Sequence, residues 1–116
     1  MLPYMHRGNL HADIPAELPD ELFTKLAGGS SARVERIVSR GHRSPAGHWY
    51  DQDEAEFVLL VAGEARLEFE GVETRTLRPG DWVTIPAHAR HRVAWTAPGR
   101  DTVWLAVFYS EGERTR

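Results

Sequence analysis

Two histidines and a glutamate stand at the ends of strand-like runs in this chain. Glu56 opens the apolar run 56–62, His91 opens the run 91–96, and His48 lies two residues before Tyr50 in a short extended stretch. Two imidazoles and a carboxylate are the usual ligands of a first-row divalent metal that keeps open coordination positions. We therefore predict a metal site formed by His48, Glu56 and His91, with Tyr50 and His88 as alternative ligands.

Each of these residues also has an ordinary structural interpretation. His91 could be a strand-end histidine that is hydrogen-bonded to backbone. Glu56 could form a salt bridge with Arg66 or Arg92, since an acid at the head of an apolar strand is costly unless it is paired or ligated. The acidic turn 51–54 could be solvated, or one of its carboxylates could reach the site instead.

Most of the chain shows the pattern of an all-β domain. From residue 31 the hydrophobic period becomes two, which is typical of strands with one wet face. Gly and Pro turns separate the runs. The strands are predicted at 33–38, 48–50, 56–62, 65–69, 74–77, 82–85, 91–96 and 102–109. About eight short strands at hairpin spacing indicate a sandwich or a barrel.

A single helix is predicted in front of these strands, at residues 18–26. Leu22, Phe23 and Leu26, with Leu18 before them, form an apolar stripe at helical spacing. Pro19 and Asp20 are good helix-start residues, and Gly28-Gly29 would end the helix. The expected organisation is an N-terminal arm and helix (1–30), a barrel (31–110) and a charged tail (111–116).

Composition narrows the class of protein. A chain of 116 residues is one domain in length. The absence of cysteine removes disulfides, thiolate zinc sites and thiol nucleophiles. A net charge of −3 gives no basic face for nucleic acid. The longest apolar run is far below the ~20 residues of a membrane helix. No apolar signal segment opens the chain, so we expect a cytoplasmic protein.

Residues 41–63 and 80–95 together resemble the two sequence motifs of the cupin superfamily. In the first motif, Glu56 is followed by six residues and then Gly63, as in the family pattern. In the second, Gly80, Pro86 and His91 fall on pattern. The resemblance spans about residues 34–109. It implies a small double-stranded β-helix, a jelly-roll-like barrel that is usually dimeric and holds a divalent transition metal inside.

The chain departs from the family pattern at several positions. The first motif histidine maps to His48, one residue late, and the second maps to Tyr50, which is ordinarily neutral because its pKa is near 10. The turn before Glu56 is longer than in the family. His88 replaces the motif glycine and Trp95 the asparagine, so His88 is a candidate for the lost ligand. The alternation 91, 93, 95 predicts that Trp95 lines the pocket.

Two functions fit these features. In the first, the protein is a cupin-like metal-binding protein that acts on a small molecule as a metal-dependent enzyme. The resemblance allows a dioxygenase, an isomerase or a decarboxylase, and iron, manganese, nickel, copper or zinc. In the second, it is a non-catalytic small-molecule binding or sensing module with a degenerate site. The run 103–109 is apolar on both faces, which predicts a homodimer.

Overall fold

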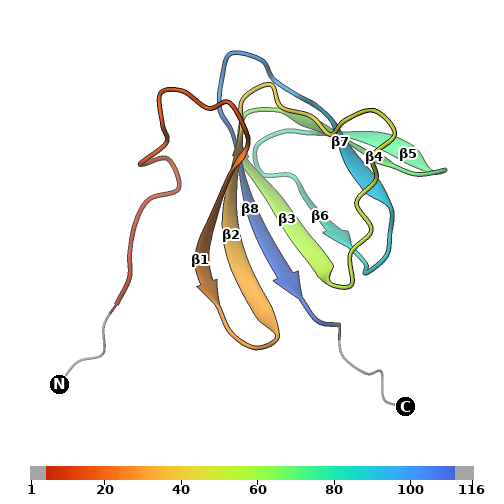
Figure 1. Cartoon of the computed structure of the whole chain (residues 1–116), viewed down its shortest axis with the longest axis horizontal. Coiled ribbons are helices and arrows are strands. Elements are labelled where there is room, and N and C mark those ends of the chain that lie inside the picture. Colours follow the sequence, from red (N-terminus) through yellow and green to blue (C-terminus); the bar gives the residue numbers. More distant parts are fainter. Residues whose placement is uncertain (1–4, 112–116) are drawn as a thin grey trace.

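The computed structural model describes residues 5–111 and contains eight strands and no helix within them. The chain folds into two antiparallel sheets, which face each other in Figure 1. The all-β prediction is therefore confirmed. The strands are β1 Leu22–Gly28, β2 Ala32–Ser39, β3 Ala55–Ala62, β4 Ala65–Phe69, β5 Glu73–Leu77, β6 Trp82–Ile85, β7 His91–Thr96 and β8 Thr102–Tyr109.

The two sheets enclose a single hydrophobic core. The larger sheet has the order β1-β2-β8-β3-β6, and the smaller has the order β5-β4-β7. Leu60 and Trp104 from the larger sheet meet Leu67 and Leu77 from the smaller one, and all four side chains are buried. Burial of these side chains from both sheets is the main favourable term that holds the sheets together.

The predicted helix at 18–26 is wrong. Residues 22–28 form β1, which pairs with β2 from Leu22 opposite Val38 to Gly28 opposite Arg33. The apolar spacing suits a helix locally, but pairing with β2 satisfies the backbone and turns Phe23 towards the interior cavity. Helix propensity is a weak prior that tertiary pairing readily overrides.

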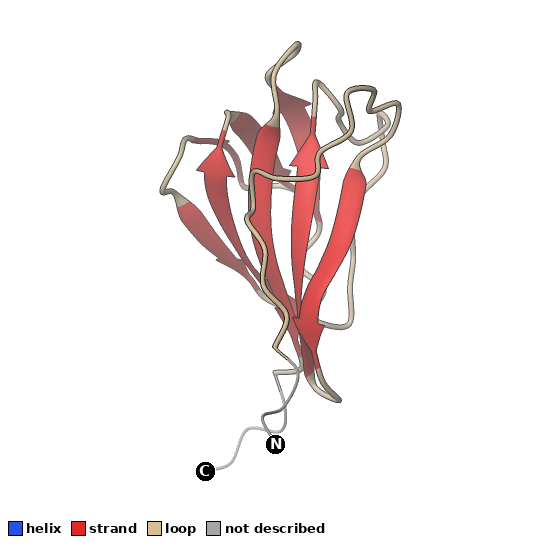
Figure 2. Ribbon diagram, turned by 90° about the vertical axis from the view of Figure 1, so that its left-hand side faces the viewer, coloured by secondary structure: helices blue, strands red, loops and turns tan. Residues whose placement is uncertain are grey.

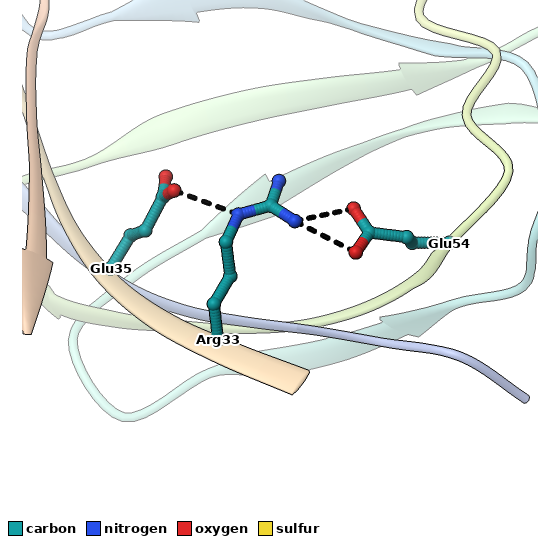
Figure 3. A network of polar contacts seen from close by, with 3 residues as sticks. All are labelled: Arg33, Glu35 and Glu54. Carbon is teal, nitrogen blue, oxygen red and sulfur yellow. Dashed lines mark hydrogen bonds and ion pairs between the residues drawn. The ribbon is translucent and has the colours of Figure 1, made fainter. Parts of the chain in front are cut away.

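The predicted strand at 48–50 is reduced to one isolated bridge between Tyr50 and His91. The segment that joins β2 to β3 therefore crosses from the larger sheet to the smaller one at Tyr50. At its far end, Glu54 accepts two hydrogen bonds from the Arg33 Nη1 atom, at 2.6 and 2.7 Å, while Arg33 Nε donates to Glu35 (Figure 3). This network fixes the segment to β2 immediately before β3 begins.

The N-terminal segment packs on the larger sheet as an extended chain without regular structure. Figure 2 shows it running along the strands on the near side. Arg36 on β2 donates to the carbonyl oxygens of Leu10 and Ala12. Arg40 donates to the carbonyls of Pro15 and Ala16 and pairs with Asp101 at 2.7 Å. Of the predicted tail, only Glu111 falls within the described residues.

Membrane-spanning helices are absent from the part of the chain that the structure describes.

Candidate functional site

An interior cavity of about 110 Å³ lies between the two sheets. Its polar lining comes from the residue before β1, from the segment before β3, and from the first residues of β3 and β7, where strands meet loops. The polar residues are Glu21, Tyr50, Gln52, Glu56 and His91, and the apolar ones are Phe23, Ile37, Val58, Leu67, Ile85, Val93, Trp104 and Phe108.

Glu56 and His91 face each other across this cavity. The Nε2 atom of His91 lies 3.7 Å from Oε1 of Glu56, and the two residues are only 5% and 8% exposed, respectively. This separation exceeds a hydrogen bond but leaves the two groups in polar contact. The Nδ1 atom of His91 lies 2.8 Å from the Ala89 carbonyl oxygen. Because a carbonyl only accepts, Nδ1 carries the hydrogen, and Nε2 is the nitrogen that faces Glu56.

The pair also determines the charge of the imidazole. Burial lowers the pKa of His91, but the contact with Glu56, the hydrogen bond to Ala89 and the negative charge of Glu56 together outweigh it. The net effect raises the pKa of His91 above its ordinary value of 6.5. The protonated imidazole is therefore favoured beside the carboxylate, which gives the cavity an acid and a base in contact.

Tyr50 forms the third polar group of the cavity. Its backbone is tied to His91 by hydrogen bonds of 2.7 and 3.2 Å, and the two ring centroids are 5.6 Å apart. Burial and the charge of Glu21 raise the pKa of Tyr50, and Glu56 adds to this, against the opposing effect of a hydrogen bond with Ser44. Tyr50 therefore keeps its hydroxyl proton and acts as a hydrogen-bond donor rather than as an anion.

His48 lies outside the cavity. It is exposed, and its ring packs edge-on against Tyr50 with a centroid separation of 5.3 Å. Tyr50 belongs to the cavity lining whereas His48 does not. The structure thus brings together Glu56 and His91 of the predicted ligands, adds Tyr50, and leaves His48 beyond it.

His88 is exposed on the loop before β7 and points to the acidic turn. Its Nδ1 atom lies 2.8 Å from Asp51, and its Nε2 atom lies 3.4 Å from Asp53. Glu54 is held by Arg33. The acids of the turn 51–54 are therefore engaged outside the cavity, and only Gln52 of this turn lines it.

Three other sequence interpretations can be compared with the structure. Arg66 stacks on Trp95 and Arg92 pairs with Glu68, so neither is the partner of Glu56. Trp95 does not line the cavity, contrary to prediction, because a register irregularity places it opposite Arg66 while Val93 is opposite Leu67. Consecutive residues of β4 point to opposite faces, so Trp95 and Val93 do as well.

Glu21 is a cavity residue that sequence reasoning missed. The predicted helix 18–26 would contain it, whereas in the structure it precedes β1. Its carboxylate accepts a hydrogen bond from the Ser39 hydroxyl, which in turn accepts one from Trp104 Nε1 at 3.2 Å. Predicting 22–28 as a strand would have placed Glu21 at a strand end, as for the other candidate site residues.

The donor set offers only part of a metal site. Imidazole and carboxylate are suitable ligands, and metal–ligand bonds of about 2.0–2.2 Å would allow one ion to contact both His91 and Glu56. Within residues 5–111, however, no group of three His, Asp or Glu side chains is arranged to hold a metal. Open catalytic zinc sites carry three protein ligands. The three-ligand set predicted from the sequence is therefore not assembled in this structure.

Known proteins resemble this chain in both sequence and structure. The family described as Cupin domain matches residues 34–108. A crystal structure from Ralstonia eutropha JMP134, which carries the provisional name of a mannose-6-phosphate isomerase, is 50% identical. The match covers 91% of this chain and 99% of that one, with a TM-score of 0.88. A search of curated proteins returned no significant match.

More distant structures share the fold. A cupin superfamily protein from Desulfitobacterium hafniense DCB-2 is 20% identical over 93% of this chain and 94% of that one, with a TM-score of 0.72. An RmlC-like cupin with a double-stranded β-helix fold from Methanocaldococcus jannaschii is 16% identical over 84% and 87%, with a TM-score of 0.66.

Proposed function

Because this chain belongs to the cupin family, we propose that its interior cavity binds a small organic molecule on which His91 and Glu56 transfer protons, in the manner of an isomerase. The observation that carries the proposal is the buried contact between His91 Nε2 and Glu56 Oε1 at 3.7 Å. An acid and a base held in one cavity are the requirement for moving a proton between adjacent carbons. The isomerase name of the 50%-identical relative supports the reaction class.

The proposed reaction interconverts a hydroxy-aldehyde and a hydroxy-ketone. Glu56 removes the proton from the carbon next to the carbonyl, while protonated His91 gives its Nε2 proton to the carbonyl oxygen, which forms an enediol. Glu56 then returns its proton to the former carbonyl carbon, and His91 recovers a proton from the other hydroxyl. Tyr50 donates a hydrogen bond to a substrate oxygen. Bonds, electrons and protons balance, and both residues end as they began.

The lining limits the substrate class. Glu21 and Glu56 contribute carboxylates, and none of the described residues that line the cavity is Lys or Arg. A phosphate group inside it would meet two carboxylates and only one cation, the imidazolium of His91. An engineered cavity of about 150 Å³ accommodates benzene, so 110 Å³ accepts a few heavy atoms. We therefore propose an uncharged hydroxy-carbonyl compound, or the uncharged end of a longer substrate whose remainder stays outside.

Solvent-exchange NMR tests this proposal. The purified chain is incubated in D₂O with neutral hydroxy-aldehydes and hydroxy-ketones, and deuterium at the exchanging carbon is measured. We expect incorporation by the wild type and a loss of about 10²–10⁴-fold in Glu56→Gln, the range typical of general-base removal. Glu73→Gln, an exposed glutamate on β5 that pairs with Arg75, is the matched control and should be unchanged. Equal exchange in wild type and Glu56→Gln would refute the assignment.

Metal binding is the second candidate, favoured by the donor types and spacing of His91 and Glu56. In this proposal those two residues hold a divalent transition metal, with Tyr50 or a reoriented His48 as further ligand. Elemental analysis of the untagged protein tests it directly. A stoichiometric metal that is lost in both His91→Ala and Glu56→Ala would favour the metal centre, whereas exchange that persists after chelation would favour proton transfer by the side chains alone.

The non-catalytic alternative uses the same cavity. A binding or sensing module would bind neutral hydroxy-carbonyl compounds saturably without placing deuterium on carbon. Ligand-detected NMR in the same samples separates it from an enzyme.

A further inference from the structure

A second concave site lies on the other side of the larger sheet from the interior cavity. The N-terminal segment lies over the larger sheet there (Figure 2). Between it and strands β1 and β2 is an open groove of about 640 Å³. The register places Arg36 opposite Thr24 on one neighbour and Leu105 on the other. The next residue, Ile37, lines the interior cavity, so Arg36 points away from that cavity and into the groove.

Arg36 is a buried cation without a carboxylate partner among the described residues. It is only 6% exposed. Its Nη1 atom donates to the carbonyl oxygens of Leu10 and Ala12 at 3.3 and 2.6 Å, and its Nη2 atom makes a 3.5 Å contact with the Thr24 hydroxyl. Its Nε atom has no hydrogen-bond partner within residues 5–111. A buried charge is costly unless a counter-charge accompanies it.

The geometry of the guanidinium shows which side is available. The Nη1 side is used by the two carbonyls of the N-terminal segment. The opposite edge, formed by Nε and Nη2, carries only the long contact to Thr24. Two parallel N–H bonds along one edge are the arrangement with which arginine binds carboxylate and phosphate oxygens in a bidentate manner.

The charges around the groove are mostly positive, as an anion-binding site requires. Arg7 lines it together with Arg36, and His6 adds an imidazole. Lys25 borders the groove, but its ammonium lies beside Arg33 on the opposite face of the sheet. Asp13 is the one carboxylate in the lining formed by the described residues. Two cations and one anion leave the groove positive in a chain whose formal net charge is −3.

We propose that this groove binds a small oxyanion, a phosphate or a carboxylate group, with the Nε–Nη2 edge of Arg36 as the buried anchor and Arg7 as an outer charge. The site is separate from the His91–Glu56 cavity, and binding here does not depend on the reaction proposed there. Because Arg36 also holds Leu10 and Ala12, the bound anion would fasten the N-terminal segment to β2.

Titration with inorganic phosphate and with acetate tests the proposal, at ionic strength held constant with chloride. Thermal unfolding and backbone amide NMR report binding, and the two anions distinguish a phosphate site from a carboxylate site. We expect a saturable rise in Tm with at least one anion and amide shifts confined to 7–13 and 24–36. Arg36→Gln should abolish the response, and Arg36→Lys, which keeps charge without the fork, should weaken it at least tenfold.

A second variant protects the test against misfolding of the Arg36 variants. Arg7→Gln removes an exposed charge that lies outside the strands and should weaken binding several-fold. Arg75→Gln, an exposed arginine on β5, is the control for net charge and should bind like wild type. Lack of a saturable wild-type response to either anion, or an equal loss in Arg75→Gln, would overturn the proposal.

Discussion

The two ring nitrogens of His91 have separate roles. Nδ1 is bound to the Ala89 carbonyl oxygen, which fixes the orientation of the ring, so Nε2 must face Glu56. The sequence identified both residues as chemically notable, because each heads an apolar strand where a charged group needs a partner. It could not show that they meet, because β3 and β7 belong to different sheets and share no ladder.

His88 offers a pH-dependent contact that can be tested by itself. Its hydrogen bond with Asp51 raises the pKa of His88, against a smaller opposing effect of burial, and the charges of Asp51 and Asp53 add to the rise. The stabilisation from this contact is therefore fully present below the ordinary pKa of 6.5 and is lost as the pH rises through the raised value. We expect Asp51→Asn to lower the titration midpoint of His88 in an NMR titration.

Asp101→Asn is the control for this titration, because Asp101 pairs with Arg40 and has no contact with His88. An unchanged His88 midpoint in Asp51→Asn would show that the contact does not form in solution.

At the scale of elements, the sequence predicted most strands of the barrel, but it did not predict the structure at 18–26 and 48–50 or the direction of Trp95. Alternation of apolar residues located β2 to β8 within a residue or two, apart from the short stretch 48–50. The helix prediction for 18–26 failed because the spacing of Leu22, Phe23 and Leu26 fits a helix, while the same residues can also form a strand that pairs with β2. The prediction that Trp95 lines the cavity failed because counting alternate residues along a strand cannot reveal a register irregularity.

The turn between β3 and β4 depends on Gly63. Its φ is +87°, and a Cβ atom there would lie 2.6 Å from Thr102 Cα and 2.8 Å from the Asp101 carbonyl oxygen. A left-handed backbone costs an alanine about 1–2 kcal/mol, and overlap with backbone adds about 1–3 kcal/mol. We expect Gly63→Ala to lower the free energy of unfolding by about 2–5 kcal/mol in urea denaturation.

Gly71→Ala is the matched control. Gly71 has a similar φ of +73°, but no atom lies within 4 Å of its would-be Cβ. It should lose only the conformational part, about 1–2 kcal/mol. Equal losses in both variants would rule out a role for the close approach to β8.

At the scale of the whole molecule, the outer face of the larger sheet carries an apolar patch. We define it by Phe57, Leu59, Trp82, Leu105 and Val107, which the strand registers place side by side. Trp82 is 62% exposed, and its ring packs 5.8 Å from that of Phe57. The homodimer expected from the sequence remains a prediction, and we propose that this patch is the contact between two copies.

Trp82→Glu tests the dimer by placing a charge in the exposed apolar surface, on the edge strand β6. We expect light scattering after size exclusion to give a dimer for wild type and a monomer for this variant, because a buried unpaired charge opposes association. Val72→Glu, at a still more exposed position on the β4–β5 turn, should remain dimeric. A monomeric wild type would leave the patch without this role.

The isolated bridge between Tyr50 and His91 holds position 50 where a different side chain could become a metal ligand. Their backbones are joined and their rings lie 5.6 Å apart, so position 50 is already pinned beside both Glu56 and His91. A single codon change, Tyr50→His, would place a second imidazole at this position. We expect the new imidazole to add a third metal ligand to His91 and Glu56. Calorimetry should then show at least about tenfold tighter binding of nickel or zinc. His11→Tyr, in the exposed N-terminal segment, should leave the affinity unchanged. Position 50 alone would then decide whether this site holds a metal tightly.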